Sequence, residues 1–147
     1  MPKRKKKNMT LTATKSKKEE LADQIKNIVK DLWYMSETDA EIFAFIGNQT
    51  EAVTKDNLLT QISLPLDSSV EERDFTELFN RLTKMQDWFG DEEKETAEKF
   101  SALRNLLETN LKDLKVFKIG RIELDVFVVG LDAEGNLMGI QTKAVET

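Results

Sequence analysis

The sequence contains no cysteine and no histidine. Without cysteine there is no disulfide bond, thiolate metal site or cysteine nucleophile, and the composition fits a reducing compartment. Without histidine the chain lacks the commonest general base and the commonest transition-metal ligand, which excludes serine–histidine and cysteine–histidine catalysis. An enzyme built from this chain would need carboxylates, lysine, tyrosine or a hard metal bound by oxygen. We therefore predict a protein that is not an enzyme and needs no cofactor.

Long apolar runs are also missing. No stretch approaches the ~20 apolar residues that a membrane-spanning helix needs, and the basic start of the chain is not followed by the apolar segment of a secretory signal. Hydrophobic residues make up 39% of the 147 residues and charged residues 33%, as in ordinary globular domains. We expect a cytoplasmic protein without membrane contact, monomeric when free, with a single domain in residues 16–147.

Acidic residues are absent from the first part of the chain, so a basic N-terminal segment precedes an acidic body. Eight of the 22 basic residues lie in residues 1–18, so residues 19–147 combine 14 basic with 27 acidic residues and carry a net charge of −13. Residues 1–15 show no apolar periodicity, and we predict a disordered basic arm there. An acidic body favours basic partners, so we expect it not to bind nucleic acid directly.

The arm itself leaves two interpretations open. Lys3–Lys7 has the composition of a nuclear localisation signal or a nucleic-acid patch, and the nucleus is then the alternative location. The same residues are also typical of a solvated tail without a function of its own.

Residues 115–147 have the pattern of a β-sheet with one apolar face, because apolar and charged residues alternate along the central strand. Phe127 and Val129 break the alternation, which predicts that this end of the strand is covered on both faces. Residues 134–136 provide the backbone freedom for a tight reversal before the last strand. The alternating apolar residues are Ile122, Leu124, Val126 and Val128.

Two amphipathic helices are predicted from apolar residues at intervals of three and four. The first spans about residues 17–34, and Ser16 and Glu19 have the spacing of a capping box at its start. The longest spans about residues 91–112, with acidic residues at the positive end of its dipole. Its buried stripe comprises Ala97, Phe100, Leu103, Leu107, Leu111 and Leu114.

Shorter elements fill the middle of the chain. Asp74 is a plausible N-cap for a helix over residues 75–82, and Asp56 could cap another that reaches Gln61. Gly47-Asn48 is interpreted as a turn, and residues 62–69 and 83–90 as loops. Strands are predicted over residues 41–46 and 70–73. Helices and strands scattered along the chain in this way predict an α+β sandwich.

Motifs for catalysis or metal binding are missing. There is no glycine-rich phosphate loop and no calcium-loop spacing. The acidic stretch Asp87–Glu93 is better interpreted as a helix start. Glu123 and Asp125 share one side of a strand and could in principle do acid–base work, but a solvated face is the better interpretation.

Three residues remain unusual under a purely structural interpretation. Glu37 lies in a loop directly after the first predicted helix. Trp88 lies in a second loop, where a tryptophan either anchors the loop to the core or serves as an interface anchor. Thr147 ends the sequence close to a strand, which would hold its terminal carboxylate near structured surface.

At these positions the sequence resembles the nuclease A inhibitor family, whose members bind and inhibit DNA/RNA nucleases that do not discriminate between sugars. The resemblance is strong over residues 83–147, thinner over 20–40 and poor over 41–75. The matching segments are Met35-Ser36-Glu37, Gln86-Asp87-Trp88 with Asp91-Glu92-Glu93, the helix from Lys99 to Lys112, the strand Gly120–Val128, and Gly135–Thr147 with its final Val-Glu-Thr.

The resemblance implies a three-layer α/β/α sandwich around a mainly antiparallel sheet, of the PR-1-like kind. It also implies a function, in which one inhibitor occludes the active site of one non-specific ββα-metal endonuclease. In this family the glutamate of the Met-Ser-Glu loop reaches toward the catalytic magnesium of the nuclease, and the loop tryptophan and terminal threonine contact the nuclease. Carried over by motif, these residues are Glu37, Trp88 and Thr147.

Physical chemistry is consistent with that expectation. A nuclease cleft is basic and holds a hard divalent cation that prefers oxygen ligands, and an acidic body accelerates encounter with such a cleft. The carboxylates of Glu37 and of the chain end could stand in for substrate phosphates. The metal would belong to the partner, so we expect none bound by this chain alone.

Two other classes of function are alternatives to nuclease inhibition. The first is an adaptor or interaction protein tethered to nucleic acid or the nucleus by the Lys3–Lys7 arm, which predicts salt-sensitive nucleic-acid binding. The second is an enzyme that uses carboxylates, for which no constellation of residues is present. The divergent residues 41–75 leave the identity of the target nuclease open.

Overall fold

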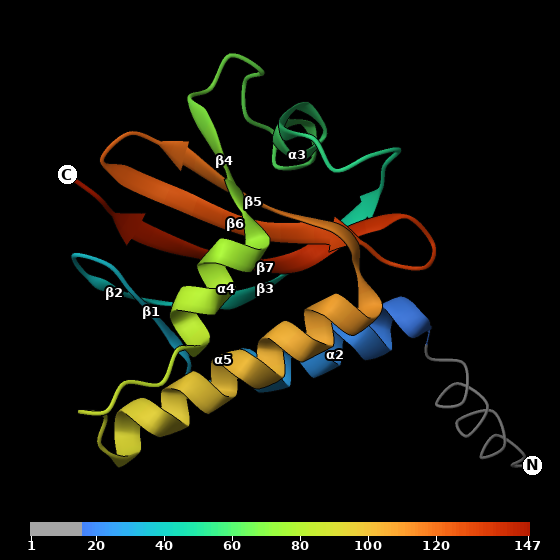
Figure 1. Ribbon diagram of the computed structural model, residues 1–147. Helices are drawn as coiled ribbons and strands as arrows, with labels where there is room; N and C mark the ends of the chain where they lie inside the picture. The colour runs from blue at the N-terminus through green and yellow to red at the C-terminus, as the bar shows by residue number, and fades with distance from the viewer. Residues whose placement is uncertain (1–15) are drawn as a thin grey trace, which may run out of the picture.

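The computed structural model describes residues 16–147 (Figure 1). Its helices are α2 (Lys17–Val29), α3 (Lys55–Gln61), α4 (Phe75–Thr83) and α5 (Asp91–Asn110). Its strands are β1 (Trp33–Met35), β2 (Asp39–Glu41), β3 (Phe43–Gln49), β4 (Val70–Asp74), β5 (Lys112–Gly120), β6 (Glu123–Leu131) and β7 (Asn136–Val145). The predicted arm over residues 1–15 lies outside the described residues. None of the helices in residues 16–147 is long and apolar enough to cross a membrane.

A five-stranded antiparallel sheet with the order β3-β7-β6-β5-β4 forms the middle layer. The last three strands of the chain follow one another as neighbours, as the alternation in residues 115–147 predicts. β7 pairs with β6 on one side and with β3 on the other. β1 and β2 form a separate hairpin beside this sheet. The end of the chain is therefore attached to an interior strand.

One face of the sheet is covered by α2, α4 and α5 (Figure 1). Leu124, Val126 and Val128 point into this layer and are buried, as predicted, whereas Ile122 lies in the β5–β6 turn and is 56% exposed. Fully buried helix residues such as Leu103 pack against these strand residues. The main core thus forms because the apolar face of the strands meets the apolar stripes of the helices.

The opposite face is covered by α3 and by the segments around it (Figure 1). Leu58 and Leu59 of α3 are fully buried in this second core, together with Val129 of β6. Phe45 meets Phe127 edge-on, with ring centroids 5.4 Å apart. The prediction that this end of β6 is covered on both faces is confirmed, and so is the α/β/α sandwich.

Capping explains where the helices begin. The predicted capping box is present, because the Ser16 hydroxyl accepts from the Glu19 backbone and Glu19 accepts from the Ser16 backbone, each at 3.1 Å. The Asp74 carboxylate accepts from the Glu77 backbone at 2.9 Å, which confirms it as the N-cap of α4. The cap of α3 is Thr54 and not Asp56, because the Thr54 hydroxyl accepts from the Asn57 backbone N–H.

The first helix is shorter than predicted, and this shortening creates β1. The helix ends at Val29, and Asp31 adopts a left-handed backbone conformation with φ of 61°, which stops a right-handed helix. Trp33 and Tyr34 therefore lie in a strand, where Tyr34 is buried and Trp33 is 46% exposed. The prediction of a helix to residue 34 is wrong at its end.

The long helix also ends slightly earlier than predicted. Ala97, Phe100, Leu103 and Leu107 form its buried stripe. Leu111 is the C-cap, and Leu114 belongs to β5, where it packs against the main core from the sheet side. Both leucines are therefore correctly assigned to the core but wrongly assigned to the helix.

Gly47-Asn48 was predicted as a turn but lies inside β3, at a register irregularity between Ile46 and Gln49. The Asn48 backbone N–H donates to the Gln61 carboxamide oxygen at 2.8 Å, and the Gln61 amide donates to the Asn48 carbonyl at 2.9 Å. A Cβ on Gly47 would collide with the Gln61 side chain and come within 2.6 Å of the Leu137 carbonyl. This glycine is needed for close packing of the chain.

Asp132 organises the β6–β7 turn. Its Oδ1 accepts from the backbone N–H groups of Glu134 at 2.9 Å and Asn136 at 2.8 Å, and the Asn136 side chain also donates to it. Gly135 has φ of 82°, as the predicted tight reversal requires. Burial alone would raise the pKa of Asp132, but the Asn136 and Glu134 hydrogen bonds and the Lys18 charge outweigh it and hold the pKa below 3.8.

Replacing Gly47 with alanine should destabilise the protein by about 2 kcal/mol, because the added methyl group overpacks the junction of β3, β7 and α3. Chemical denaturation measures this change. Gly90→Ala is the comparison, since a Cβ there meets only the Glu93 carboxylate, at 3.1 Å. Equal stability of Gly47→Ala and wild type would contradict the close packing described for residue 47.

Asp132→Asn should lower the free energy of unfolding at neutral pH by about 1 kcal/mol, the usual net value of a side-chain hydrogen bond. Because the pKa is lowered in the folded state, ionised Asp132 stabilises the fold above its ordinary pKa of 3.8. This stabilisation is lost as the pH falls through the lowered folded-state pKa. Unfolding curves of wild type and variant should converge in acid, and a difference that is independent of pH would oppose this assignment.

Candidate functional site

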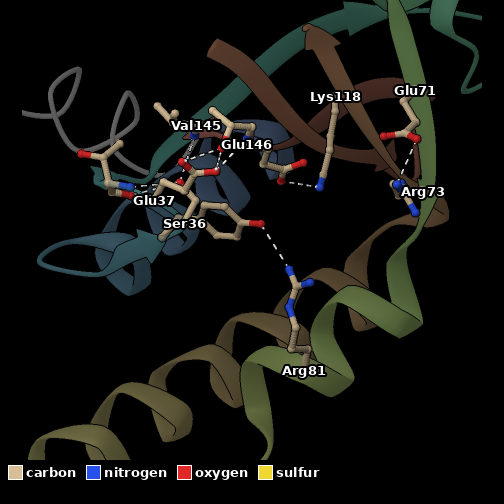
Figure 2. A network of polar contacts seen from close by, with 11 residues as sticks. Ser36, Glu37, Glu71, Arg73, Arg81, Lys118, Val145 and Glu146 are labelled. Carbon is tan, nitrogen blue, oxygen red and sulfur yellow. Dashed lines mark hydrogen bonds and ion pairs between the residues drawn. The ribbon is translucent and has the colours of Figure 1, made fainter. Parts of the chain in front are cut away.

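The loop between β1 and β2 carries Glu37, and Ser36 fixes the shape of this loop (Figure 2). The Ser36 hydroxyl donates to the Thr38 carbonyl at 3.1 Å, and the Ser36 backbone N–H donates to the same carbonyl at 3.0 Å. The hydroxyl oxygen also accepts from the Val145 backbone N–H at 3.0 Å. The Val145 carbonyl in turn accepts from the Glu37 backbone N–H at 3.3 Å. The loop is thus attached to the end of β7.

Glu37 and Thr147 lie in direct contact although 110 positions separate them in the sequence. The Glu37 carboxylate accepts from the Thr147 backbone N–H at 2.7 Å and from the Thr147 hydroxyl at 2.9 Å to Oε2 and 3.1 Å to Oε1. Both residues are exposed. The structure therefore brings together two of the three residues that the sequence singled out, on an accessible edge of the molecule.

Trp88 lies in the loop between α4 and α5, with 73% of its surface exposed. Its ring touches Phe89 edge-on, with centroids 4.8 Å apart. This exposure does not fit the alternative that Trp88 anchors the loop to the core. It fits the alternative that the side chain is available to a partner.

A groove of about 370 Å³ connects Trp88 with the strand that precedes Glu37. Met35, two residues before Glu37, is 69% exposed and lines this groove, and so does Trp33. We call this surface the aromatic groove. It is lined by Trp33, Met35, Arg81, Leu82, Lys84, Trp88, Phe89, Glu92, Glu93, Thr96, Ala97 and Phe100.

The sequence pattern does not reveal Trp33 as a surface residue, because helical periodicity places residue 33 at the end of the first predicted helix, packed against the core. The alternation of β1 makes Tyr34 point inward and exposes the side chains of Trp33 and Met35. The signal was present as three large side chains in a row, Trp-Tyr-Met, but a strand of three residues is too short for alternation to be recognised.

Two of the remaining acidic candidates, Glu93 and Asp125, have structural partners. Glu93 accepts from the Gly90 backbone N–H at 3.0 Å and so caps α5, as the helix-start interpretation requires. Asp125 forms an exposed ion pair with Lys143 at 3.2 Å, as expected of a solvated face. Across residues 16–147, no group of three or more acidic side chains is arranged to hold a metal ion.

A polar cleft includes Glu146, the residue before Thr147, in its lining. It has a volume of about 400 Å³ and is lined mainly by the charged residues of β4, α4 and β5 together with Glu146. Arg81 forms part of this cleft and donates to the Tyr34 hydroxyl at 3.3 Å, which connects α4 to β1 (Figure 2). Positive and negative side chains alternate here, so the cleft has no strong preference for one charge.

Comparison with models of protein families finds a match over residues 19–147 to the family described as nuclease A inhibitor-like protein. The match includes residues 41–75, where the resemblance read from the sequence was poor. It also contains Glu37, Trp88 and Thr147. No curated protein matches the chain.

Proposed function

The chain belongs to the nuclease A inhibitor-like family, and on this basis we propose that it binds a non-specific DNA/RNA endonuclease one-to-one and occludes its metal-containing active site. Family membership implies the role of a nuclease inhibitor. The proposed one-to-one occlusion of the active site is supported above all by one observation, the exposed Glu37 carboxylate that Thr147 holds in place.

Glu37 is the group that we expect to reach the catalytic magnesium of the nuclease. Mg²⁺ prefers oxygen ligands and commonly binds through one or two carboxylates and several waters. A carboxylate on a protruding loop can occupy the position of a substrate phosphate oxygen. Because the loop is attached to β7 through Ser36 and Val145, little conformational freedom is lost when the carboxylate binds, which favours affinity.

The charge of the body supports the same target. Residues 19–147 combine 14 basic with 27 acidic residues, and an active site that binds nucleic acid has a positive field. Opposite fields accelerate association, and the acceleration weakens as salt increases.

The aromatic groove supplies the apolar part of the proposed interface. Exposed tryptophans are frequent energetic centres of protein interfaces, and neighbouring apolar residues exclude water around them. Trp33, Met35 and Trp88 provide such a surface beside the Glu37 loop. We therefore propose that the carboxylate enters the active site while the groove binds the rim of the cleft.

Glu37→Ala, Trp88→Ala and deletion of Thr147 should each weaken inhibition of a ββα-metal endonuclease by roughly 30-fold, the range of an interface hot spot. Inhibition titrations with purified nuclease and magnesium measure this effect. Matched controls are Glu51→Ala, which removes the same charge, and Leu66→Ala, which removes an exposed apolar side chain, since both lie in the segments that flank α3 and neither lines the aromatic groove.

Two outcomes of this titration would be negative for different reasons. If a stoichiometric amount of wild type leaves cleavage unchanged, the proposed function is wrong for that enzyme. If wild type inhibits and all three variants inhibit equally well, the function stands and the assignment of the site is wrong.

Residues added after Thr147 should reduce inhibition far more than the same residues added before Met1. An extension at residue 147 would crowd the edge where Thr147 contacts Glu37, whereas an extension at the start of the chain adds to residues that the family match does not include. Comparing the inhibition constants of the two tagged proteins tests this. If both tags weaken inhibition equally, or if only the tag before Met1 weakens it, the edge formed by Glu37 and Thr147 is not the surface that binds the nuclease.

A further inference from the structure

Lys118 is a charged residue in an unusual position for its type. It lies near the C-terminal end of β5 with only 9% of its surface exposed. Its Nζ is 2.7 Å from Glu146 Oε2 (Figure 2). In the exposed pair Lys143–Asp125, by contrast, the two side chains are 78% and 48% exposed. A lysine amine is rarely buried without a partner because the loss of hydration is costly.

The sheet explains why this lysine is buried. Val116, two residues earlier in β5, is fully buried in the main core, so Lys118 points to the same face. Its antiparallel partner in β6 is Val126, which is 1% exposed. Lys118 thus lies beside the apolar core at the floor of the polar cleft, where Glu146 binds its amine.

The partner of Lys118 lies immediately before Thr147. Val145 is the last residue of β7, and it and the two residues that follow are each held by hydrogen bonds to other parts of the chain. Val145 is bound to Ser36, and Thr147 is bound to Glu37. Between them, the Glu146 backbone N–H donates to the Ile122 carbonyl at 2.9 Å, and the Glu146 side chain binds Lys118.

We propose that Lys118 and Glu146 are a positioning pair, which fixes the tail so that Thr147 orients the Glu37 carboxylate toward the nuclease. The inference rests on the proposed function. Lys118 lines the polar cleft and is only 9% exposed, so we expect it to act on inhibition through Glu146 and Thr147 and not through contact with the nuclease. A pre-oriented carboxylate loses less conformational entropy on binding, and the complex accordingly dissociates more slowly.

Charge provides a way to separate positioning from long-range attraction. Lys118→Met makes the acidic body more negative, whereas Glu146→Gln makes it less negative. Electrostatic steering would therefore shift the association rates in opposite directions. Positioning predicts instead that both variants raise the dissociation rate, because each one releases the same tail.

The experiment measures association and dissociation rates of Lys118→Met and Glu146→Gln with a ββα-metal endonuclease that wild type inhibits. Both variants should dissociate about 10-fold faster than wild type. The controls are Lys143→Met and Asp125→Asn, which remove the same charges from the exposed pair of the neighbouring strands, and their dissociation rates should equal that of wild type. Wild-type dissociation rates in Glu146→Gln would overturn the proposal.

Combination with a deletion of Thr147 distinguishes positioning from general loss of structure. If Lys118 acts through the tail, Lys118→Met should add no further acceleration to dissociation once Thr147 is absent. Fully additive effects would overturn the proposal. Should Lys118→Met fail to fold, Glu146→Gln replaces it in the combination with the Thr147 deletion. The Glu146 side chain is 40% exposed, so this substitution disturbs the core less.

A measurement on the free protein separates this inference from the proposed function. The ¹⁵N heteronuclear NOE of the Thr147 amide reports fast motion of the tail, and it should fall in both variants relative to wild type and to the Lys143→Met control. If it falls while wild type inhibits no nuclease, the positioning pair stands and the proposed function fails. If it is unchanged, the positioning pair is wrong whatever the protein inhibits.

Discussion

The placement of β7 between β3 and β6 is the constraint on which the rest of the structure depends. Over residues 138–141 this strand is paired on both edges, and Gly139 approaches the Val128 carbonyl so closely that a side chain there would collide with it. An interior strand has little freedom to move without breaking pairing on both sides. The residues that follow it therefore start from a fixed point, and the Ser36 and Lys118 contacts extend that order to Thr147.

The two covered faces of the sheet have different roles. The face under α2, α4 and α5 holds the larger core, and its helices carry the loop of Trp88 and the start of the aromatic groove. The face under α3 holds a smaller core that closes around Phe127 and Leu137. The candidate site combines the contact between the β1–β2 loop and the tail after β7 with the aromatic groove between β1 and the α4–α5 loop. Contributions from three separate segments make its geometry dependent on the whole fold.

Sequence patterns predicted the elements that obey a simple period or a local capping rule. The alternation of Leu124, Val126 and Val128 indicated the sheet face, and Asp74 indicated the start of α4. The predictions of secondary structure were wrong where the local sequence patterns were short or ambiguous. β1 has three residues, and the stop signal before it is the left-handed backbone of Asp31, an ordinary helix-surface residue by composition. Gly47 resembles a turn glycine in sequence, but a glycine is needed there because Gln61, which is distant in sequence, packs against it.

The sequence by itself determined the family, the separation of basic and acidic segments, and the identity of Glu37, Trp88 and Thr147 as unusual residues. These features depend on residue type and order along the chain. Only the tertiary structure decided that Glu37 and Thr147 meet, that Trp33 and Met35 continue the surface next to Trp88, and that Lys118 holds the residue before Thr147. The physical reason is that each of these contacts joins residues far apart in sequence, so the pairing of strands and the packing of helices on the sheet decide them.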